Sequence, residues 1–388
     1  MLERARSRID DARLYALIGC RIVPLNTLFQ LLAHQGGAML GCAETLLLMP
    51  DLMSYWLSGE IAAERTIAST TELYDPSSGD WCDEVINALG IPRRLFPSLQ
   101  SPGTVRGRIR PDLVAEHGVP DGLPVIATAA HDTGSAFVSV TSGPASLVVS
   151  SGTWSLTGIE TREPVITPEA MAANFTNEAG AGGTNRFLRN AAGMWLIQEC
   201  RRTWAREGRT YSYDELTALA GTAPPFGSVI DPDDPVFLPP GDMPARIRAF
   251  CERTGQRPPE TAGETVRCVL ESLALTYRAL TEHVRRLTGR PIETVHIISG
   301  GSRNALRCRL AAGATGLPVL SGPVEATAIG NVMVQAMALG AVSSLDEIRD
   351  VVRRSFAPAR YEPEGDRAAW NAAYATYLEL IAGSVDCR

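Results

Sequence analysis

Two apolar segments of the chain each end in a short polar loop, and this pairing constrains the fold more than any other feature. The first segment, 125–130, runs into HDT at 131–133, and the second, 145–149, runs into SSGTWS at 150–155. Short apolar runs bounded by turn residues predict buried strands. Loops at strand ends are where α/β folds place their chemistry. We therefore expect an α/β fold with functional residues in both loops.

The two loops offer different chemistry. Asp132 supplies a carboxylate that can accept a proton. The Gly, Ser and Thr turn at 150–155 can hold an anion, because its backbone N–H groups and hydroxyls are donors and glycine lets the backbone approach closely. A base together with a phosphate-binding turn suggests phosphoryl transfer to an alcohol. Either loop alone would be an ordinary turn, so the interpretation depends on their order and separation.

A third loop follows a β-branched strand predicted at 294–298. It has the sequence SGGSRN at 299–304 and leads into a helix that continues to Ala314. A strand, a glycine turn and a helix form an arrangement typical of nucleotide sites, because N–H groups at a helix start favour negative ligand atoms. The loop matches neither GxGxxG nor the Walker sequence. A plain turn between strand and helix is therefore the alternative interpretation.

Other segments predict the scaffold around these loops. Helical spacing of apolar residues predicts helices over 1–60 and from about 187 to 205. Thr261 and Glu264 have capping-box spacing and predict the start of a long helix. A short strand is expected at 318–321. The small residues that follow it, up to Gly330, suit close helix packing.

Composition limits the class of protein. With 388 residues, 45% hydrophobic and 20% charged, the chain is predicted to be soluble and globular, with a break near 140–144. A net charge of −7 and the lack of a basic stripe argue against a nucleic-acid partner. Eight scattered cysteines without CxxC spacing fit reduced thiols and a cytoplasmic location. No stretch of ~18 apolar residues occurs, so no membrane span is expected, and the separated histidines predict no metal cluster.

Several motifs together closely resemble the FGGY carbohydrate kinases. They are AAHDTGSA, SSGTWSLTGIE, NFTNE, GMWLIQECRR, IISGGSRN and GPVEATAIGN, and the resemblance covers the chain from about Arg13 to its end. It implies an α/β, actin-like fold of two ribonuclease-H-like domains, here 1–141 and 142–388, the second carrying the adenosine-binding loop. It also implies ATP as phosphoryl donor and Mg²⁺ held mainly by phosphate oxygens and water.

The motif NFTNE and the GMWLIQECRR segment most resemble family members that act on L-rhamnulose. This implies transfer of the ATP γ-phosphoryl group to the O1 hydroxyl of that ketose in rhamnose catabolism. Two alternatives stay open. The chain could be a kinase for L-fuculose, D-xylulose or glycerol, or a degenerate kinase that binds ligand without efficient turnover.

The resemblance also assigns individual residues. Asp132 matches the catalytic base, and His131 and Thr133 flank it at the sugar. Asn190 matches a sugar contact. The ATP contacts that it implies are Thr153, Gln198 and Gly301. Without the resemblance, Asn190 and Gln198 would be ordinary surface positions, eight residues apart on one predicted helix.

The chain departs from the family pattern at its start. Family members open with a strand, a phosphate-1 turn and a second strand, whereas this sequence begins in the helical part. We expect an incomplete N-terminal domain without the phosphate-1 loop, and Met1 as a mis-assigned start or a truncation. The predicted strand 125–130 would then lack sheet neighbours, and an unpaired apolar strand favours self-association.

Overall fold

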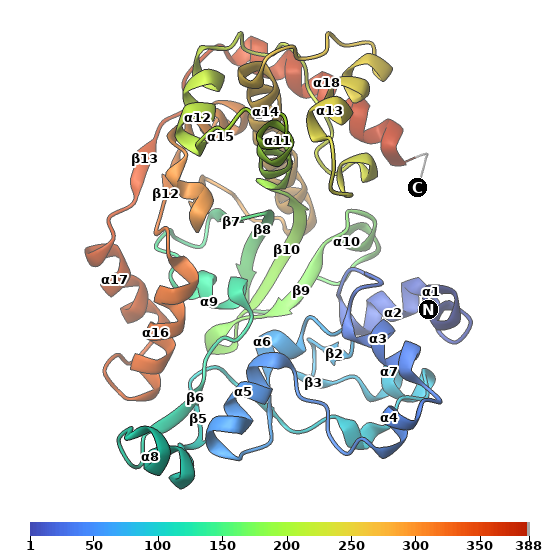
Figure 1. Cartoon of the computed structure of the whole chain (residues 1–388), viewed down its shortest axis with the longest axis vertical. Coiled ribbons are helices and arrows are strands. Elements are labelled where there is room, and N and C mark those ends of the chain that lie inside the picture. The colour runs from blue at the N-terminus through green and yellow to red at the C-terminus, as the bar shows by residue number, and fades with distance from the viewer. Residues whose placement is uncertain (386–388) are drawn as a thin grey trace. The chain divides into compact units, whose positions relative to one another are not determined.

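The computed structural model describes residues 1–385. By internal contacts the chain forms two compact units, each built from three chain segments (Figure 1). Unit 1 comprises Met1–Thr141, Ile159–Arg189 and Ala326–Ser355, and unit 2 comprises Ser142–Gly158, Asn190–Glu325 and the chain from Phe356 onward. The division of the sequence at 141 stays a prediction, because the units are assembled from interleaved segments.

Unit 1 begins with helices, as the sequence predicts. Its helices are α1 (Leu2–Arg6), α2 (Asp11–Ile18), α3 (Thr27–His34), α4 (Ala38–Cys42), α5 (Met49–Ser58), α6 (Arg65–Ala68), α7 (Asp83–Ala88), α8 (Pro111–His117), α9 (Asp132–Val138), α10 (Pro168–Ala172), α16 (Ala326–Ala338) and α17 (Leu345–Ser355). Its short strands are β1 (Ala63–Glu64), β2 (Tyr74–Asp75), β3 (Asp80–Trp81), β4 (Leu99–Gln100), β5 (Thr104–Arg108), β6 (Pro124–Ala127) and β9 (Thr176–Ala179). Leu14, Leu28, Leu32 and Val85 from α2, α3 and α7 share one hydrophobic core.

Unit 2 carries the three parallel strands β7 (Ser146–Ser151), β11 (Thr294–Ile298) and β12 (Val319–Ser321). β13 (Ala359–Tyr361) pairs antiparallel with β12. The helices of unit 2 are α11 (Trp195–Arg206), α12 (Tyr213–Thr222), α13 (Met243–Arg253), α14 (Ala262–Thr288), α15 (Ala305–Thr315) and α18 (Arg367–Val385). The strands predicted at 145–149, 294–298 and 318–321 are confirmed. The capping box of Thr261 and Glu264 at the start of α14 is confirmed as well.

The remaining strands, β8 (Trp154–Thr161) and β10 (Asn185–Ala192), run through segments of both units. The largest sheet has the order β13-β12-β11-β7-β8-β10-β9. β7 and β8 form an antiparallel hairpin, and so do β9 and β10. The turn of the first hairpin is the predicted phosphate-binding loop.

The expectation of an unpaired strand at 125–130 is wrong. The strand is shorter, Pro124–Ala127, and pairs antiparallel with β5, with Val105 opposite Ile126. The Gly-, Pro- and Arg-rich segment before it supplies β5 and thereby the missing hydrogen bonds. Since β6 has a partner, the argument for self-association through an unpaired strand no longer holds.

The helix predicted from 187 to 205 is also wrong in its first half. Residues 185–192 form strand β10, which pairs with β9, and only Trp195–Arg206 is helical. Gly193 separates the two elements. Asn190 and Gln198 therefore lie on different elements, and the argument from their spacing on one helix does not apply.

Helix α16 packs directly against α9. A Cβ added to Gly330 of α16 would overlap the carbonyl oxygen of Ser135 in α9. Only a residue without a side chain allows two helix backbones to approach this closely. The predicted close helix packing near Gly330 is confirmed, and it supports the helix that begins at Asp132.

Candidate functional site

The loop before α9 is held by the buried carboxylate of Glu64. Glu64 accepts hydrogen bonds from the backbone N–H of Ala130 at 3.0 Å and from the hydroxyl of Thr66 at 2.5 Å. The Thr66 hydroxyl in turn accepts the N–H of His131 at 3.0 Å. Burial raises the pKa of Glu64. The segment β1–α6 therefore fixes the backbone that presents the HDT loop.

Asp132 is the first residue of α9, and its carboxylate is exposed. No described residue donates a hydrogen bond to that carboxylate, whereas the backbone carbonyl of Asp132 accepts one from the Thr327 hydroxyl at 3.2 Å. A free, exposed carboxylate on a fixed backbone can accept a proton from a ligand hydroxyl. Thr133, in contrast, is only 5% exposed.

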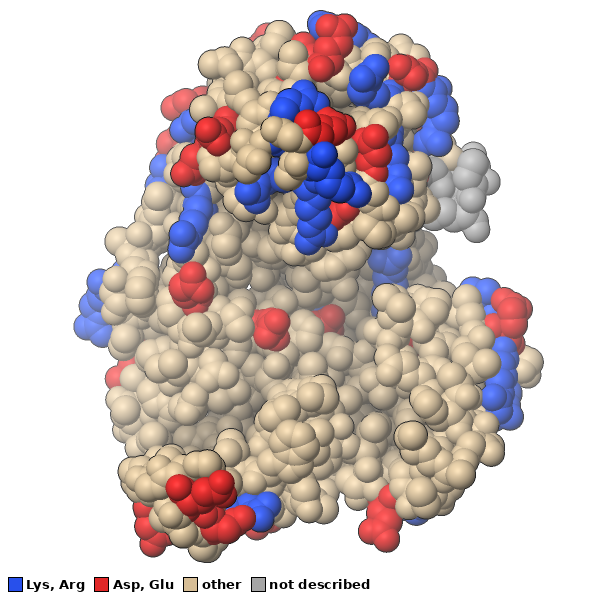
Figure 2. Space-filling model, in the orientation of Figure 1, with Lys and Arg blue, Asp and Glu red and all other residues tan. Residues whose placement is uncertain are grey.

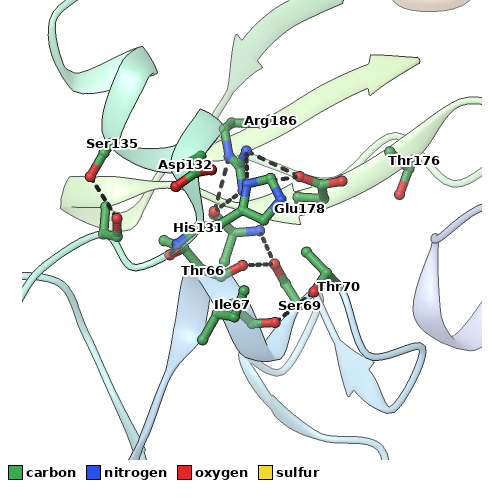
Figure 3. Close-up of polar contacts among 12 residues, drawn as sticks. Thr66, Ile67, Ser69, Thr70, His131, Asp132, Ser135, Thr176, Glu178 and Arg186 are labelled. Carbon is green, nitrogen blue, oxygen red and sulfur yellow. Dashed lines mark hydrogen bonds and ion pairs between the residues drawn. The ribbon is translucent and has the colours of Figure 1, made fainter. Parts of the chain in front are cut away.

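His131 contacts a buried ion pair formed by Arg186 and Glu178 (Figure 3). Its Nδ1 lies 3.2 Å from Nη1 of Arg186 and 4.0 Å from Oε2 of Glu178. Arg186 and Glu178 are 3.0 Å apart and face each other across β10 and β9. Burial lowers the pKa of His131. Sequence reasoning gave neither charged residue a role. Glu178 stands in the polar strand TNEA and Arg186 in a strand with a second arginine, so the local sequence singles out neither of them.

The predicted phosphate turn is packed against the start of α11. Gly152 and Thr153 connect β7 to β8, and their carbonyls accept the N–H groups of Met194 and Trp195, both at 3.1 Å. A Cβ on Gly193 would come within 2.6 Å of the Trp154 carbonyl carbon. The turn and the start of the helix are thus hydrogen-bonded and closely packed as one piece.

Two predicted ATP residues, Thr153 of the turn and Gln198 of α11, are in contact here. The hydroxyl of Thr153 donates to Oε1 of Gln198 at 3.3 Å. Asn190, the predicted sugar contact, is exposed near the end of β10 and takes no part in this pair. The roles of all three residues stay predictions, but the geometry joins Thr153 to Gln198.

The predicted adenosine loop lies beside the phosphate turn. Its parent strand β11 pairs with β7, with Ile298 opposite Ser150. The Ser299 hydroxyl is 3.3 Å from that of Ser150. A Cβ on Gly301 would overlap the Ser151 hydroxyl. The two loops therefore follow neighbouring parallel strands in direct contact.

Beneath both loops lies Arg307 of α15, which sequence reasoning did not select. It is fully buried and donates hydrogen bonds to the hydroxyls of Ser151, Ser155 and Tyr277. The chain contains no lysine, so arginines are its permanent cations. Arg307 places such a cation directly under the phosphate turn, where it ties β7 and β8 to α14.

The residues offer little to a protein-bound metal. Among residues 1–385, no group of three or more His, Cys, Asp or Glu side chains could hold a metal ion. This does not conflict with a magnesium ion carried by a bound nucleotide, because such an ion takes most of its ligands from phosphate oxygens and water. In the same described part of the chain, the helices lack the combination of length and apolarity needed to cross a bilayer. On the face seen in Figure 2, acidic and basic side chains are interspersed.

Comparison with known proteins identifies the class. The models for the N-terminal and C-terminal domains of the FGGY family of carbohydrate kinases match residues 1–139 and 147–339. The chain is 45% identical to a rhamnulokinase of Bacteroides thetaiotaomicron, over 97% of this chain and 77% of the relative. It is 40% identical to one of Enterococcus faecalis, over 90% of this chain and 70% of the relative.

Solved structures agree on the fold. Xylulose kinase from Rhodospirillum rubrum matches with a TM-score of 0.79 at 21% identity, covering 98% of this chain and 77% of that one. Plasmodium falciparum glycerol kinase with ADP matches with a TM-score of 0.76 at 13% identity, covering 97% and 75%. Fold and loops thus define an ATP-dependent carbohydrate kinase with the predicted α/β, actin-like two-domain fold. Within that class, the chain belongs to the FGGY family.

Proposed function

We propose that this chain transfers the γ-phosphoryl group of ATP to the O1 hydroxyl of L-rhamnulose, giving L-rhamnulose 1-phosphate and ADP. The observation that carries the proposal is the 45% identity to a rhamnulokinase over 97% of the chain, which includes both the HDT loop and the nucleotide loops. A cytoplasmic location and the sequence division into 1–141 and 142–388 belong to the same proposal.

Asp132 is the base of the proposed reaction. As O1 attacks the γ-phosphorus, its proton passes to the Asp132 carboxylate, and the bond from the γ-phosphorus to the β–γ bridging oxygen breaks to release ADP. His131, Thr133 and Asn190 are the proposed sugar contacts. The free carboxylate of Asp132 and its tethered backbone support this role.

Thr153, Gln198 and Gly301 are the proposed ATP contacts. The contact between the phosphate turn and the loop of Gly301 supports binding of one nucleotide by both loops. Mg²⁺, held by phosphate oxygens and water, would neutralise phosphate charge when bound. Arg307 adds a fixed positive charge beneath the turn.

The test is ADP release from Mg-ATP with L-rhamnulose, beside L-fuculose, D-xylulose and glycerol. The proposal predicts release with L-rhamnulose above the other three, and loss of at least about 100-fold in Asp132→Asn. Asp121→Asn, which alters another exposed carboxylate of unit 1, serves as the control. Faster ADP release with another of these sugars would identify that sugar as the substrate in place of L-rhamnulose. No ADP release from the folded chain with any of them would indicate a degenerate kinase that only binds ligand.

A further inference from the structure

The ion pair behind His131 joins two neighbouring strands of the sheet and is almost fully buried. Arg186 and Glu178 are directly opposite in the β9–β10 ladder, with side chains 0% and 6% exposed. Nε and Nη2 of Arg186 both donate to the carbonyl of Ala179, at 3.2 and 3.1 Å. A buried arginine held at three nitrogens cannot swing toward solvent, so its third nitrogen points in one direction (Figure 3).

This third nitrogen, Nη1 of Arg186, determines which ring nitrogen of His131 carries the proton. A guanidinium has only donors, so the Nδ1 atom 3.2 Å from Nη1 of Arg186 must be the acceptor. In the neutral ring the proton is then on Nε2. Nε2 has no hydrogen-bond partner among the described residues, and the His131 side chain is 21% exposed. The ring therefore offers one N–H group to a ligand, next to the carboxylate of Asp132.

We propose that Glu178 and Arg186 are positioning residues that hold His131 as an Nε2–H donor to a sugar oxygen while Asp132 accepts the proton of the attacking hydroxyl. This inference rests on the proposed sugar kinase function. It gives the HDT loop one oriented donor, on His131, and one acceptor carboxylate, on Asp132. A polyhydroxylated ketose matches that pair, because its adjacent oxygens can accept from one group and donate to the other.

The charges around the ring support the assignment. Glu178 of β9, Arg186 of β10 and Asp132 of α9 act on His131 directly, while Glu64 and Glu160 act on Arg186. Burial lowers the pKa of His131 and favours the neutral ring. A proton on Nδ1 would face the guanidinium and remove the acceptor.

The first test observes the ring itself. Nitrogen NMR of ¹⁵N-histidine-labelled full chain, with the His131 signals assigned by their loss in His131→Gln, distinguishes the two neutral tautomers. We expect a protonated Nε2 in the parent chain and a mixture of tautomers in Arg186→Met. A parent ring protonated at Nδ1 would overturn the proposal, even if Arg186→Met does not fold.

The second test separates the two substrates. Arg186→Met should raise KM for L-rhamnulose at least about 10-fold, because the ring loses the donor that fixes its tautomer, with KM for ATP nearly unchanged. Arg186→Lys, which keeps a donor, should recover part of this loss. Arg106→Met removes another buried, paired arginine of unit 1 and should leave the tautomer and the sugar KM unchanged. Equal changes in both KM values would reject a positioning role.

The two tests also separate this inference from the proposed function. If L-rhamnulose is not a substrate but His131 is protonated at Nε2, the substrate proposal is rejected and the assigned tautomer is retained. If L-rhamnulose is phosphorylated but the ring carries its proton on Nδ1, only the positioning role of Arg186 and Glu178 is rejected.

Discussion

The hydroxyl of Thr153 hydrogen-bonds to the side-chain amide of Gln198 across 3.3 Å, joining the phosphate turn to helix α11. The two residues are 45 positions apart in sequence. Their contact places two predicted ATP residues, far apart in sequence, in one local structure. If both side chains bind the nucleotide as proposed, the contact predicts that their contributions are interdependent.

Thr153→Ala and Gln198→Ala should therefore be non-additive. Each is expected to raise KM for ATP by roughly tenfold, and the double variant should cost less than the product of the two, because contacting residues couple. Steady-state kinetics of all four chains measure the coupling. Thr222→Ala, an exposed helix-end threonine of the same unit, is the control. Strict additivity would show that the two side chains act separately.

Two adjacent glycines give a matched pair of variants. A Cβ at Gly301 would overlap Ser151 and the buried Arg307, whereas one at Gly300 meets nothing within 4 Å. Gly301→Ala should weaken ATP binding by about tenfold or more and lower the melting temperature, as overpacking does. Gly300→Ala should change neither quantity. Calorimetric titration with ATP and thermal melting measure the two effects. Equal ATP affinities and equal melting temperatures of the two variants would contradict the described packing.

The pKa of His131 should respond in opposite directions to its two charged neighbours. Glu178 raises this pKa and Arg186 lowers it. Glu178→Gln should therefore move the pKa of His131 down, and Arg186→Gln should move it up. A pH titration of the labelled histidine measures both. Shifts of the same sign would mean that the variants act through altered burial instead of charge.

Buried His296 predicts acid sensitivity of unit 2. Burial lowers its pKa from 6.5 to about 4, while its ring bonds to the Ser142 hydroxyl and the Gly322 carbonyl. Between those pH values the unfolded chain binds the extra proton, so the free energy of unfolding falls as pH falls, by on the order of 3 kcal/mol. Denaturant unfolding from pH 7 to 4 measures this slope. His296→Gln should flatten it, and the exposed control His34→Gln should not.

Gly330→Ala should destabilise unit 1 by about 1–3 kcal/mol, because the new methyl group overlaps a backbone carbonyl that cannot rotate away. The same substitution at Gly340, where nothing lies within 4 Å but φ is +77°, should produce only the smaller strain of a left-handed alanine. The melting temperatures of the two variants measure these losses of stability. A larger drop in melting temperature for Gly340→Ala than for Gly330→Ala would argue against the close contact of α16 and α9.

The sequence predicted what local pattern determines. The apolar run at 145–149 and the β-branched run at 294–298 form strands, and Thr261 caps a helix, because apolar spacing and capping chemistry are local. The sequence alone predicts a helix at Asn190, because the apolar residues at 187–192 fit the helical period as well as the strand period. Only the pairing of this segment with β9 selects a strand.

The parts that were missed depend on distant partners. Glu178 and Arg186 become a site only when β9 and β10 align, and only then does His131 reach Nη1 of Arg186. Arg307 looks like a surface charge in its helix, and three hydroxyls from separate strands and a helix make its burial possible. The loops at 131–133 and 150–155 were selected from the sequence itself, but the individual roles proposed for their residues came from the family resemblance, since a loop sequence alone does not fix a role.

The packing of α16 on α9 also affects how the protein can be made. Domains generally fold from the N-terminus as the chain leaves the ribosome. Here Thr327, which contacts the carbonyl of Asp132, is synthesised 195 residues after it. The HDT loop therefore emerges before the helix that supports it, and unit 1 cannot complete its native packing until translation has passed Ser355.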